Sequence, residues 1–113
     1  AYIDSITTTG AINKNTSAWQ AKTTTYTAVA GDRLIVDTSG GAFTITLPAS
    51  PSLGDEVRFL DATASFDTNN LTIGRNSLKI MGQTADMTIA VEDAAIQLVY
   101  TGSTYGWKLT QNN

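Results

Sequence analysis

The sequence contains no cysteine and no histidine among its 113 residues. Without cysteine, the chain can form neither disulfides nor thiolate metal sites. Without histidine, it lacks the commonest general base and the commonest transition-metal ligand. Ser-His-Asp, Cys-His and zinc-hydrolase chemistry are therefore excluded as they are normally built. Carboxylates remain the main candidates for any chemistry.

Basic residues and long apolar runs are also scarce. Seven Lys and Arg residues against ten Asp and Glu residues give a net charge of −3 and a pI near 4.5. The basic residues are scattered, so we expect no nucleic-acid partner. No apolar run approaches the roughly 20 residues that span a bilayer, so we expect no membrane insertion. The length predicts one domain that can bury a core without disulfides.

Threonine, serine, valine and isoleucine are abundant, and several stretches alternate apolar and polar residues at period two. This pattern predicts an all-β fold, specifically an antiparallel β-sandwich of jelly-roll type. The one helix candidate, Ala90 to Ala95, is too short to be convincing. Strands are predicted near Thr25–Ala30, Arg33–Thr38, Ala42–Leu47, Glu56–Asp61, Leu71–Gly74, Leu78–Met81, Met87–Ala90, Ala95–Thr101 and Tyr105–Thr110.

Two features organise the chain around these strands. In the stretch 42–47, Phe43, Ile45 and Leu47 share one face. The preceding Thr-Ser-Gly-Gly turn predicts that this stretch folds back on 33–38 as a hairpin. Residues 1–18 are polar with isolated isoleucines and cannot offset their ordering entropy alone. They are predicted to form an extended lead-in that contacts other copies or an upstream shaft, and 19–113 the folded domain.

Four aspartates lie in two similar segments, GDRLIVD and GDEVRFLD: Asp32, Asp37, Asp55 and Asp61. We favour a structural role, because Asp at a strand end accepts hydrogen bonds from nearby backbone N–H groups. A calcium site is the second interpretation, although no DxDxDG-type loop is present. A glycosidase pair is the third, since two carboxylates about 5–10 Å apart suffice without histidine. We expect no enzyme activity, no bound metal and no cofactor.

Aromatic residues are the remaining binding candidates, because flat rings with polar tips offer rigid contact area. Tyr105 follows a Thr-Gly-Ser-Thr turn, which predicts a place near a loop tip. Trp107 is a second candidate, although packing in the core beside Tyr100 is the alternative. Trp19 precedes the first predicted strand and could fill a seam between subunits. Arg75 and Asn76 could contact a ligand, although a solvated turn is the alternative.

Several segments together resemble the C-terminal tip domains of tailed-phage tail fibres and related virion adhesins. They are "TYTAVAGDRLIVDTSGGAFTITLPASPSLGDEVRFLD", "NNLTIGRNSLKIMG" and "LVYTGSTYGWKL". The segment "SITTTGAIN" is similar to the Gly-punctuated shaft that precedes such tips. The resemblance covers Trp19 to Leu109 and offers no fixed binding motif to carry over.

The resemblance implies a β-rich, homotrimeric tip domain in residues 19–113, carried outside the cell on the virion. Such domains bind a carbohydrate or protein on a bacterial surface and have no enzyme activity of their own. The candidate receptor contacts are Tyr105, Trp107, Arg75 and Asn76. Two alternatives stay open: a structural virion protein, such as a capsid decoration or fibre-assembly domain, and a polysaccharide-cleaving enzyme.

Overall fold

The structure, a computed structural model, describes residues 18–112. These residues form strands and turns and no helix, so the predicted all-β class is confirmed. The predicted lead-in lies outside the described residues, except for its last residue. The strands are β2 (Trp19–Lys22), β3 (Tyr26–Thr27), β4 (Arg33–Val36), β5 (Phe43–Thr46), β6 (Glu56–Asp61), β7 (Leu71–Gly74), β8 (Met87–Ile89), β9 (Ala95–Tyr100) and β10 (Trp107–Asn112).

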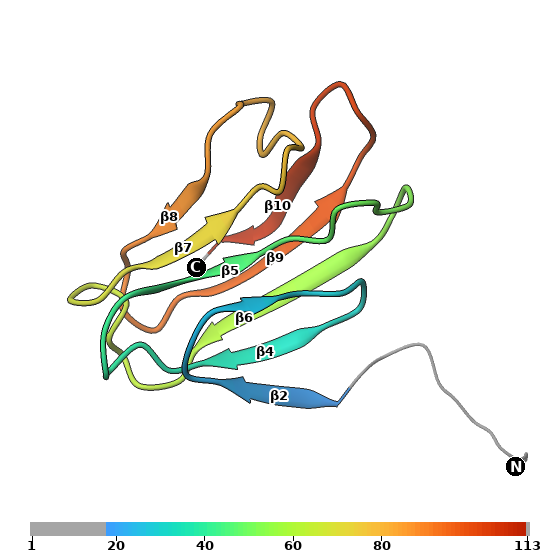
Figure 1. The fold of residues 1–113 in the computed structure, drawn as a ribbon. Helices are drawn as coiled ribbons and strands as arrows, with labels where there is room; N and C mark the ends of the chain where they lie inside the picture. Colours follow the sequence, from blue (N-terminus) through green and yellow to red (C-terminus); the bar gives the residue numbers. More distant parts are fainter. Residues whose placement is uncertain (1–17, 113) are drawn as a thin grey trace, which may run out of the picture.

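The strands form two sheets, which Figure 1 shows as two layers. The first sheet has five strands in the order β10-β9-β6-β4-β2, and the second has four in the order β3-β5-β7-β8. From β2 to β7 the chain alternates between the sheets, placing one strand in each per turn. Successive strands of one sheet are therefore parallel, as β2, β4 and β6 are in the first. The last three strands, β8 to β10, add antiparallel pairs at the end of this winding.

The predicted antiparallel, jelly-roll-like pairing is wrong for four of the seven strand pairs in residues 18–112. The hairpin predicted between 33–38 and 42–47 does not form. β4 pairs with β2 and β6, whereas β5 lies in the other sheet between β3 and β7. The connecting residues cross the end of the core instead: buried Thr38 hydrogen-bonds Ser65 through their hydroxyl oxygens at 3.1 Å. The prediction failed because alternation identifies the buried face of a strand but not its partner.

One hydrophobic core lies between the two sheets. Inward residues alternate along each strand, as Leu34 and Val36 do in β4 and Val57 and Phe59 do in β6. The outward face of the second sheet is rich in threonine, with Thr44 beside Thr72 on the neighbouring strand. The buried core consists of Ala28, Leu34, Val36, Ile45, Leu47, Val57, Phe59, Phe66, Leu71, Ile73, Ile80, Ala94, Ile96, Leu98 and Trp107.

Some predicted strands have the observed bounds, whereas one predicted strand does not form and one observed strand was not predicted. The strands Glu56–Asp61 and Leu71–Gly74 have the predicted bounds. The strand predicted at Leu78–Met81 is wrong, because only Ile80 makes isolated bridges there. The strand Trp19–Lys22 was not predicted, and its alternation is weak because it lies at a sheet edge.

Candidate functional site

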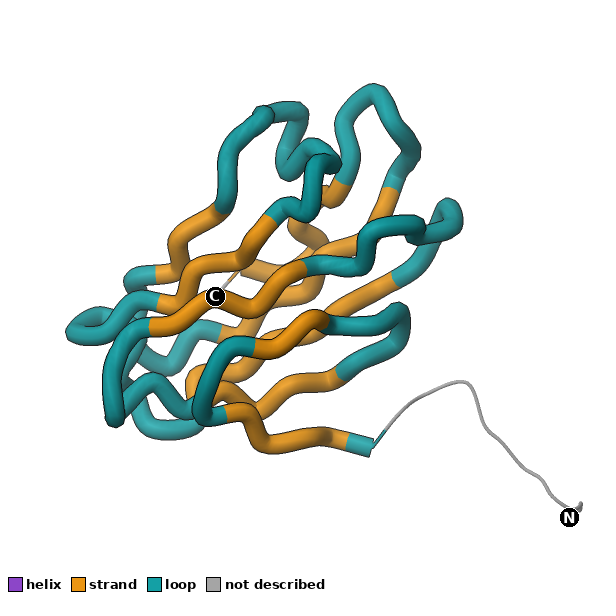
Figure 2. Tube along the Cα trace, viewed as in Figure 1, coloured by secondary structure: helices purple, strands orange, loops and turns teal. Residues whose placement is uncertain are grey.

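Four loops meet at one end of the two sheets, which we call the loop end: residues 28–32, 47–55, 75–86 and 101–106. Parallel β3, β5 and β7 finish at this end, so the first three loops gather there. β9 runs antiparallel to β6, and backbone bonds join Gly54 and Asp55 to Tyr100. Figure 2 shows these loops on the right and upper side of the strands.

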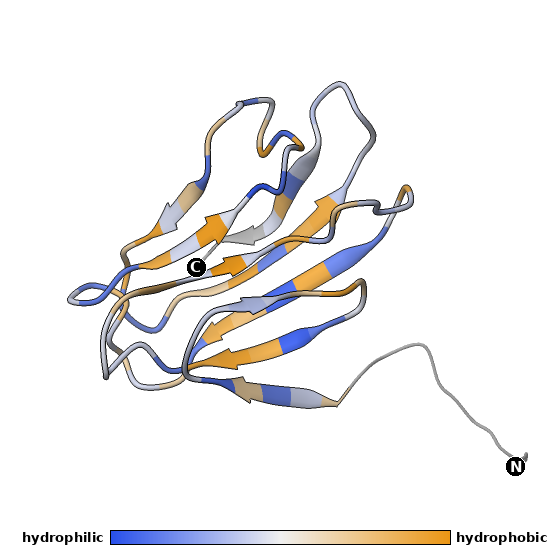
Figure 3. Cartoon of the chain, viewed as in Figure 1, coloured by the Kyte–Doolittle hydropathy of each residue, from blue (hydrophilic) through white to orange (hydrophobic). Residues whose placement is uncertain are grey.

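Most exposed large apolar side chains of the described residues lie at the loop end. Five of the six are there, and only Val91 is at the opposite end. Leu53 is 78% exposed and Tyr105 is 59% exposed. Figure 3 shows the hydrophobic colour at the tips of the loops that follow β3 and β5. Single exposed apolar residues are ordinary, but their collection at one end indicates a contact surface. The five are Trp19, Val29, Leu53, Met81 and Tyr105.

Two of the loops are bonded to each other backbone to backbone. Trp107 N donates to Lys79 O at 2.9 Å, Met81 N to Trp107 O at 2.7 Å, and Gly82 N to Tyr105 O at 2.9 Å. Gly106 makes this approach possible, because a Cβ there would lie 1.9 Å from Lys79 O. Its φ of +73° is also a conformation that favours glycine. The paired loops, residues 79–83 and 101–107, are therefore held as one unit.

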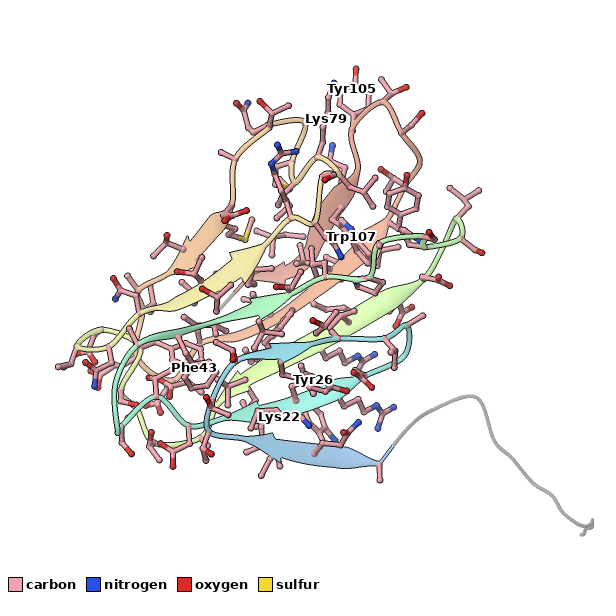
Figure 4. All side chains as sticks on the ribbon, in the orientation of Figure 1. Lys22, Tyr26, Phe43, Lys79, Tyr105 and Trp107 are labelled. Atoms are coloured by element: carbon pink, nitrogen blue, oxygen red, sulfur yellow. The ribbon has the colours of Figure 1, made fainter. Side chains whose placement is uncertain are left out.

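The paired loops present an aromatic ring with cations near it. Lys108 Nζ lies 5.3 Å from the ring centre of Tyr105, a cation–π contact. Figure 4 shows Lys79 and Tyr105 near each other on the two adjacent loops, with Trp107 below them. Exposed Met81 adds a flexible apolar side chain to the same unit. The exposed side chains of this surface offer stacking, apolar contact and positive charge.

The structure separates the two predicted aromatic contacts. Tyr105 lies exposed at a loop tip, as its turn sequence predicts. Trp107 is 0% exposed, so its ring presents no surface to a ligand in this structure. Its ring lies 5.4 Å from the ring of Tyr100, which is the core alternative. The difference arises because Tyr105 lies in the turn before β10, whereas Trp107 is the first residue of the strand and faces inward.

Arg75 and Asn76 lie at the start of the loop that carries Lys79. The Arg75 Nη1 group donates to Leu78 O at 3.2 Å, and its backbone N–H donates to Asp86 Oδ1 at 2.9 Å. The Asn76 Nδ2 group donates to Leu47 O at 2.9 Å and thereby links two loops. Both side chains are half-buried and hold the loops in place. They are close to the paired loops but support them rather than extend them.

The four aspartates each accept hydrogen bonds from backbone N–H groups, as the structural interpretation predicts. Asp32 accepts from Val29 N, Asp37 from Ser39 N, and Asp55 from Ser52 N. The residues that the structure describes contain no group of three Asp or Glu side chains placed to hold a metal ion. The calcium interpretation therefore finds no ligand cluster in residues 18–112.

Asp61 has the most extensive set of donors. Its carboxylate accepts from the backbone N–H groups of Thr63, Ser65, Phe66 and Asp93 at 3.0–3.3 Å. Burial by itself raises the pKa of Asp61, but these four bonds outweigh burial and lower it below the usual value. The hydrogen bonds of Ser39 and Thr63 similarly lower the pKa of exposed Asp37. Both carboxylates are thus ionised and hold turns.

An apolar groove of about 310 Å³ lies between the edges of the two sheets. It contains no titratable side chain, so it offers apolar contact and no acid–base chemistry. Its lining residues are Thr88, Ile89, Ala90, Val91, Ala94, Ile96 and Leu109.

Sequence reasoning missed Lys79, Met81, Leu53 and Val29 as surface residues of the loop end. Leu53 had a usable signal, because it lies between Pro51 and Gly54 in a turn-rich segment. No sequence signal marked Met81 and Lys79 as surface residues, because the segment 78–81 was predicted to be a strand.

No segment of residues 18–112 is a helix long and apolar enough to cross a bilayer. Comparison with known proteins gave no match: no family model fits the chain, and no curated protein matches it significantly.

Proposed function

We propose that the chain is a receptor-binding tip domain of a phage tail fibre, which attaches the virion to a bacterial surface carbohydrate or protein. In this proposal the two sheets form a β-sandwich that presents the loop end to the host. The observation that carries it is the gathering of five of the six exposed large apolar side chains in that one place. The local resemblance of the sequence to fibre tips supports it.

The arrangement of the first sheet adds support. β2 is at one edge of the five-stranded sheet and β10 is at the other. The paired loops lie beside β10, so the lead-in joins the domain at the opposite edge of the sheet. Three copies joined through their lead-ins, on the β2 side of the sheet, would keep all three sets of paired loops accessible. Three shallow sites on one axis would strengthen attachment, because once one site is bound the other two meet the surface at a high effective concentration.

The proposed contacts are Tyr105, Lys79, Met81 and Lys108, supported from below by Arg75 and Asn76. We propose no catalysis, metal or cofactor for the domain. The hydrogen-bonded aspartates support that proposal, because a carboxylate committed to backbone donors is a poor acid–base group.

The test uses fluorescently labelled protein on a panel of bacterial strains, with mass in solution measured in parallel. We expect a trimer that adheres to some strains. Tyr105→Ala should reduce adhesion about tenfold or more while changing the free energy of unfolding by less than about 0.5 kcal/mol. The control is Val91→Ala, which truncates an exposed apolar side chain at the opposite end.

A second candidate is a structural virion protein, a capsid decoration or fibre-assembly domain. It is favoured by an apolar row on the outer face of the first sheet, where Ala21, Ile35, Leu60 and Ala95 are in register. A monomeric protein that binds none of the strains but assembles with a virion protein would establish this candidate instead. New reducing ends from host capsule or lipopolysaccharide would contradict both candidates and indicate an enzyme.

A further inference from the structure

The outer face of the first sheet carries a second cluster, which shares only Trp19 with the exposed apolar side chains of the loop end and contains none of the proposed receptor contacts. Trp19, Arg33 and Arg58 occupy one register row on three neighbouring strands, β2, β4 and β6. Neighbouring strands are about 4.8 Å apart, so the two arginine side chains start side by side. Leu34 and Phe59, next along β4 and β6, are buried, so Arg33 and Arg58 project from the opposite, outer face.

Two arginines side by side on neighbouring strands repel each other, and the described residues place few negative charges near them to offset this repulsion. Like charges directly opposite on neighbouring strands are destabilising. The only ion pair found in residues 18–112 is between Arg58 Nη2 and Glu56 Oε1, at 3.9 Å. Arg33 makes no ion pair there; its guanidinium lies 5.8 Å from the ring centre of Trp19. The row therefore carries more positive charge than its surroundings balance.

The same row borders a hollow. A depression of about 250 Å³ is lined by Trp19, Arg58, Leu60 and Ala95, with Phe59 and Ile96 beneath. Trp19 is 42% exposed although it is large and apolar. An aromatic wall, an apolar floor and the cationic side chain of Arg58 at the rim, with Arg33 next to it in the row, combine the features of a site for a small amphipathic anion.

We propose that this row binds a carboxylate-bearing sugar, such as a uronic acid residue of an acidic bacterial polysaccharide. Arginine's planar fork matches a carboxylate, and the cation–π contact with Trp19 orients the Arg33 guanidinium before binding. The face of Trp19 provides stacking area for the sugar ring. The hollow lies just below the usual 300–1,000 Å³ range of ligand pockets, which suits one or two rings.

Charge distribution separates this ligand from a nucleic acid. The chain's net charge of −3 would repel a long polyanion, whereas a single carboxylate interacts mainly with the two arginines of the row. The site shares no residue with the paired loops, so a failure of this proposal can be distinguished from a failure of the proposed function.

The test follows the two indole N–H resonances of the full chain by NMR, since the sequence contains only Trp19 and Trp107. The probes are oligogalacturonate, oligoalginate and hyaluronan fragments, each compared with its methyl-esterified form. We expect at least one acidic probe to shift the Trp19 signal saturably, and its ester to bind about tenfold more weakly or not at all. The buried Trp107 signal is the internal control and should stay in place.

Variants add directional tests. Arg33→Gln or Arg58→Gln should weaken binding about tenfold, whereas Lys22→Gln removes the same charge outside the row and should not. Glu56→Gln removes the competing carboxylate and should tighten binding severalfold. A merely structural role for Glu56 would not produce tighter binding. Strain adhesion through Tyr105 should be unchanged in Glu56→Gln.

Three results would overturn the proposal. The first is no Trp19 shift with any acidic probe at tens of millimolar. The second is equal binding of acid and ester, which would leave only aromatic contact. The third is a change of mass in solution for Arg33→Gln and Arg58→Gln, which would identify the row as an interface between copies.

Discussion

Asp61 shows how one side chain can hold a turn that would otherwise leave backbone N–H groups unpaired. Four backbone donors converge on its carboxylate, from the turn after β6 and from the turn before β9. A buried donor without a partner costs about 1–3 kcal/mol. The residue therefore links two connections that are more than 30 positions apart in sequence.

Asp61 should make stability depend on pH in a defined direction. Its pKa is lower in the folded chain than the usual value of 3.8, so it stabilises the fold above that value. The stabilisation is lost as pH falls through the folded pKa. We expect Asp61→Asn to lower the free energy of unfolding by about 2 kcal/mol at neutral pH. The variant should also lose less of its free energy of unfolding than the original chain between about pH 5 and pH 2, as measured by urea unfolding.

The exposed carboxylate of Asp67, in the turn that follows, provides the control. Asp67→Asn should leave both the stability at neutral pH and its pH dependence close to those of the original chain. Equal pH profiles for the Asp61 and Asp67 variants would contradict the role assigned to Asp61.

Gly106 is the second residue on which a local structure depends. We expect Gly106→Ala to destabilise the fold by about 2–3 kcal/mol, because its Cβ would overlap Lys79 O and its φ is positive. Amide hydrogen exchange in 79–83 and 101–107 should rise most. Gly54→Ala also has positive φ but meets no atom, so its cost should be about 1 kcal/mol. Equal losses for the two variants would show that the close approach is unimportant.

At the scale of strands, each alternating segment has two faces of different character. The inward faces make the core, the outward face of the second sheet is mostly threonine, and the outward face of the first sheet carries the charged row. Such alternation was readable from the sequence for 43–47 and 95–100. It also explains why Trp107 and Lys108, although adjacent, face the core and the surface respectively.

The alternation of the chain between the two sheets can be tested with a disulfide, since the chain has no cysteine of its own. Ile35 and Leu60 are register partners on parallel β4 and β6. We expect the double variant Ile35→Cys, Leu60→Cys to form an intramolecular bridge on oxidation, seen by mass spectrometry. The pair Ile35→Cys, Thr44→Cys would bridge only if 33–38 and 42–47 formed a hairpin, so we expect free thiols.

At the scale of the whole molecule, binding strength should depend on how many copies act together. The core cluster of the described residues lies between Ala28 and Trp107, and we expect removal of residues 1–17 to leave the fold intact by circular dichroism. We expect the mass in solution to fall from about 36 kDa, three times 12.0 kDa, to that of one copy. Apparent affinity for bacteria should fall about a hundredfold, because linked sites gain effective concentration. A shortened chain that stays trimeric would place the contacts between copies in the folded domain.

The position of the loops is also a property of the whole molecule. Leu53, Met81 and Tyr105 come from three different loops and are more than twenty positions apart in sequence. They meet because parallel strands of one sheet end at the same side, and because β9 returns beside β6. No window of the sequence contains this information.

The sequence by itself determined the β class, the inward face of each well-patterned strand, and the aspartates as acceptors at strand ends. These follow from local physics: rotamer restriction in β-branched residues, period-two geometry, and short-range hydrogen bonds from Asp to the backbone. Only the tertiary structure decided that β4 and β5 belong to different sheets and that Trp107 is buried while Tyr105 is exposed. Only it placed Trp19, Arg33 and Arg58 in one row. Strand partners are chosen by packing between segments distant in sequence, and a pattern that fixes a face leaves the partner open.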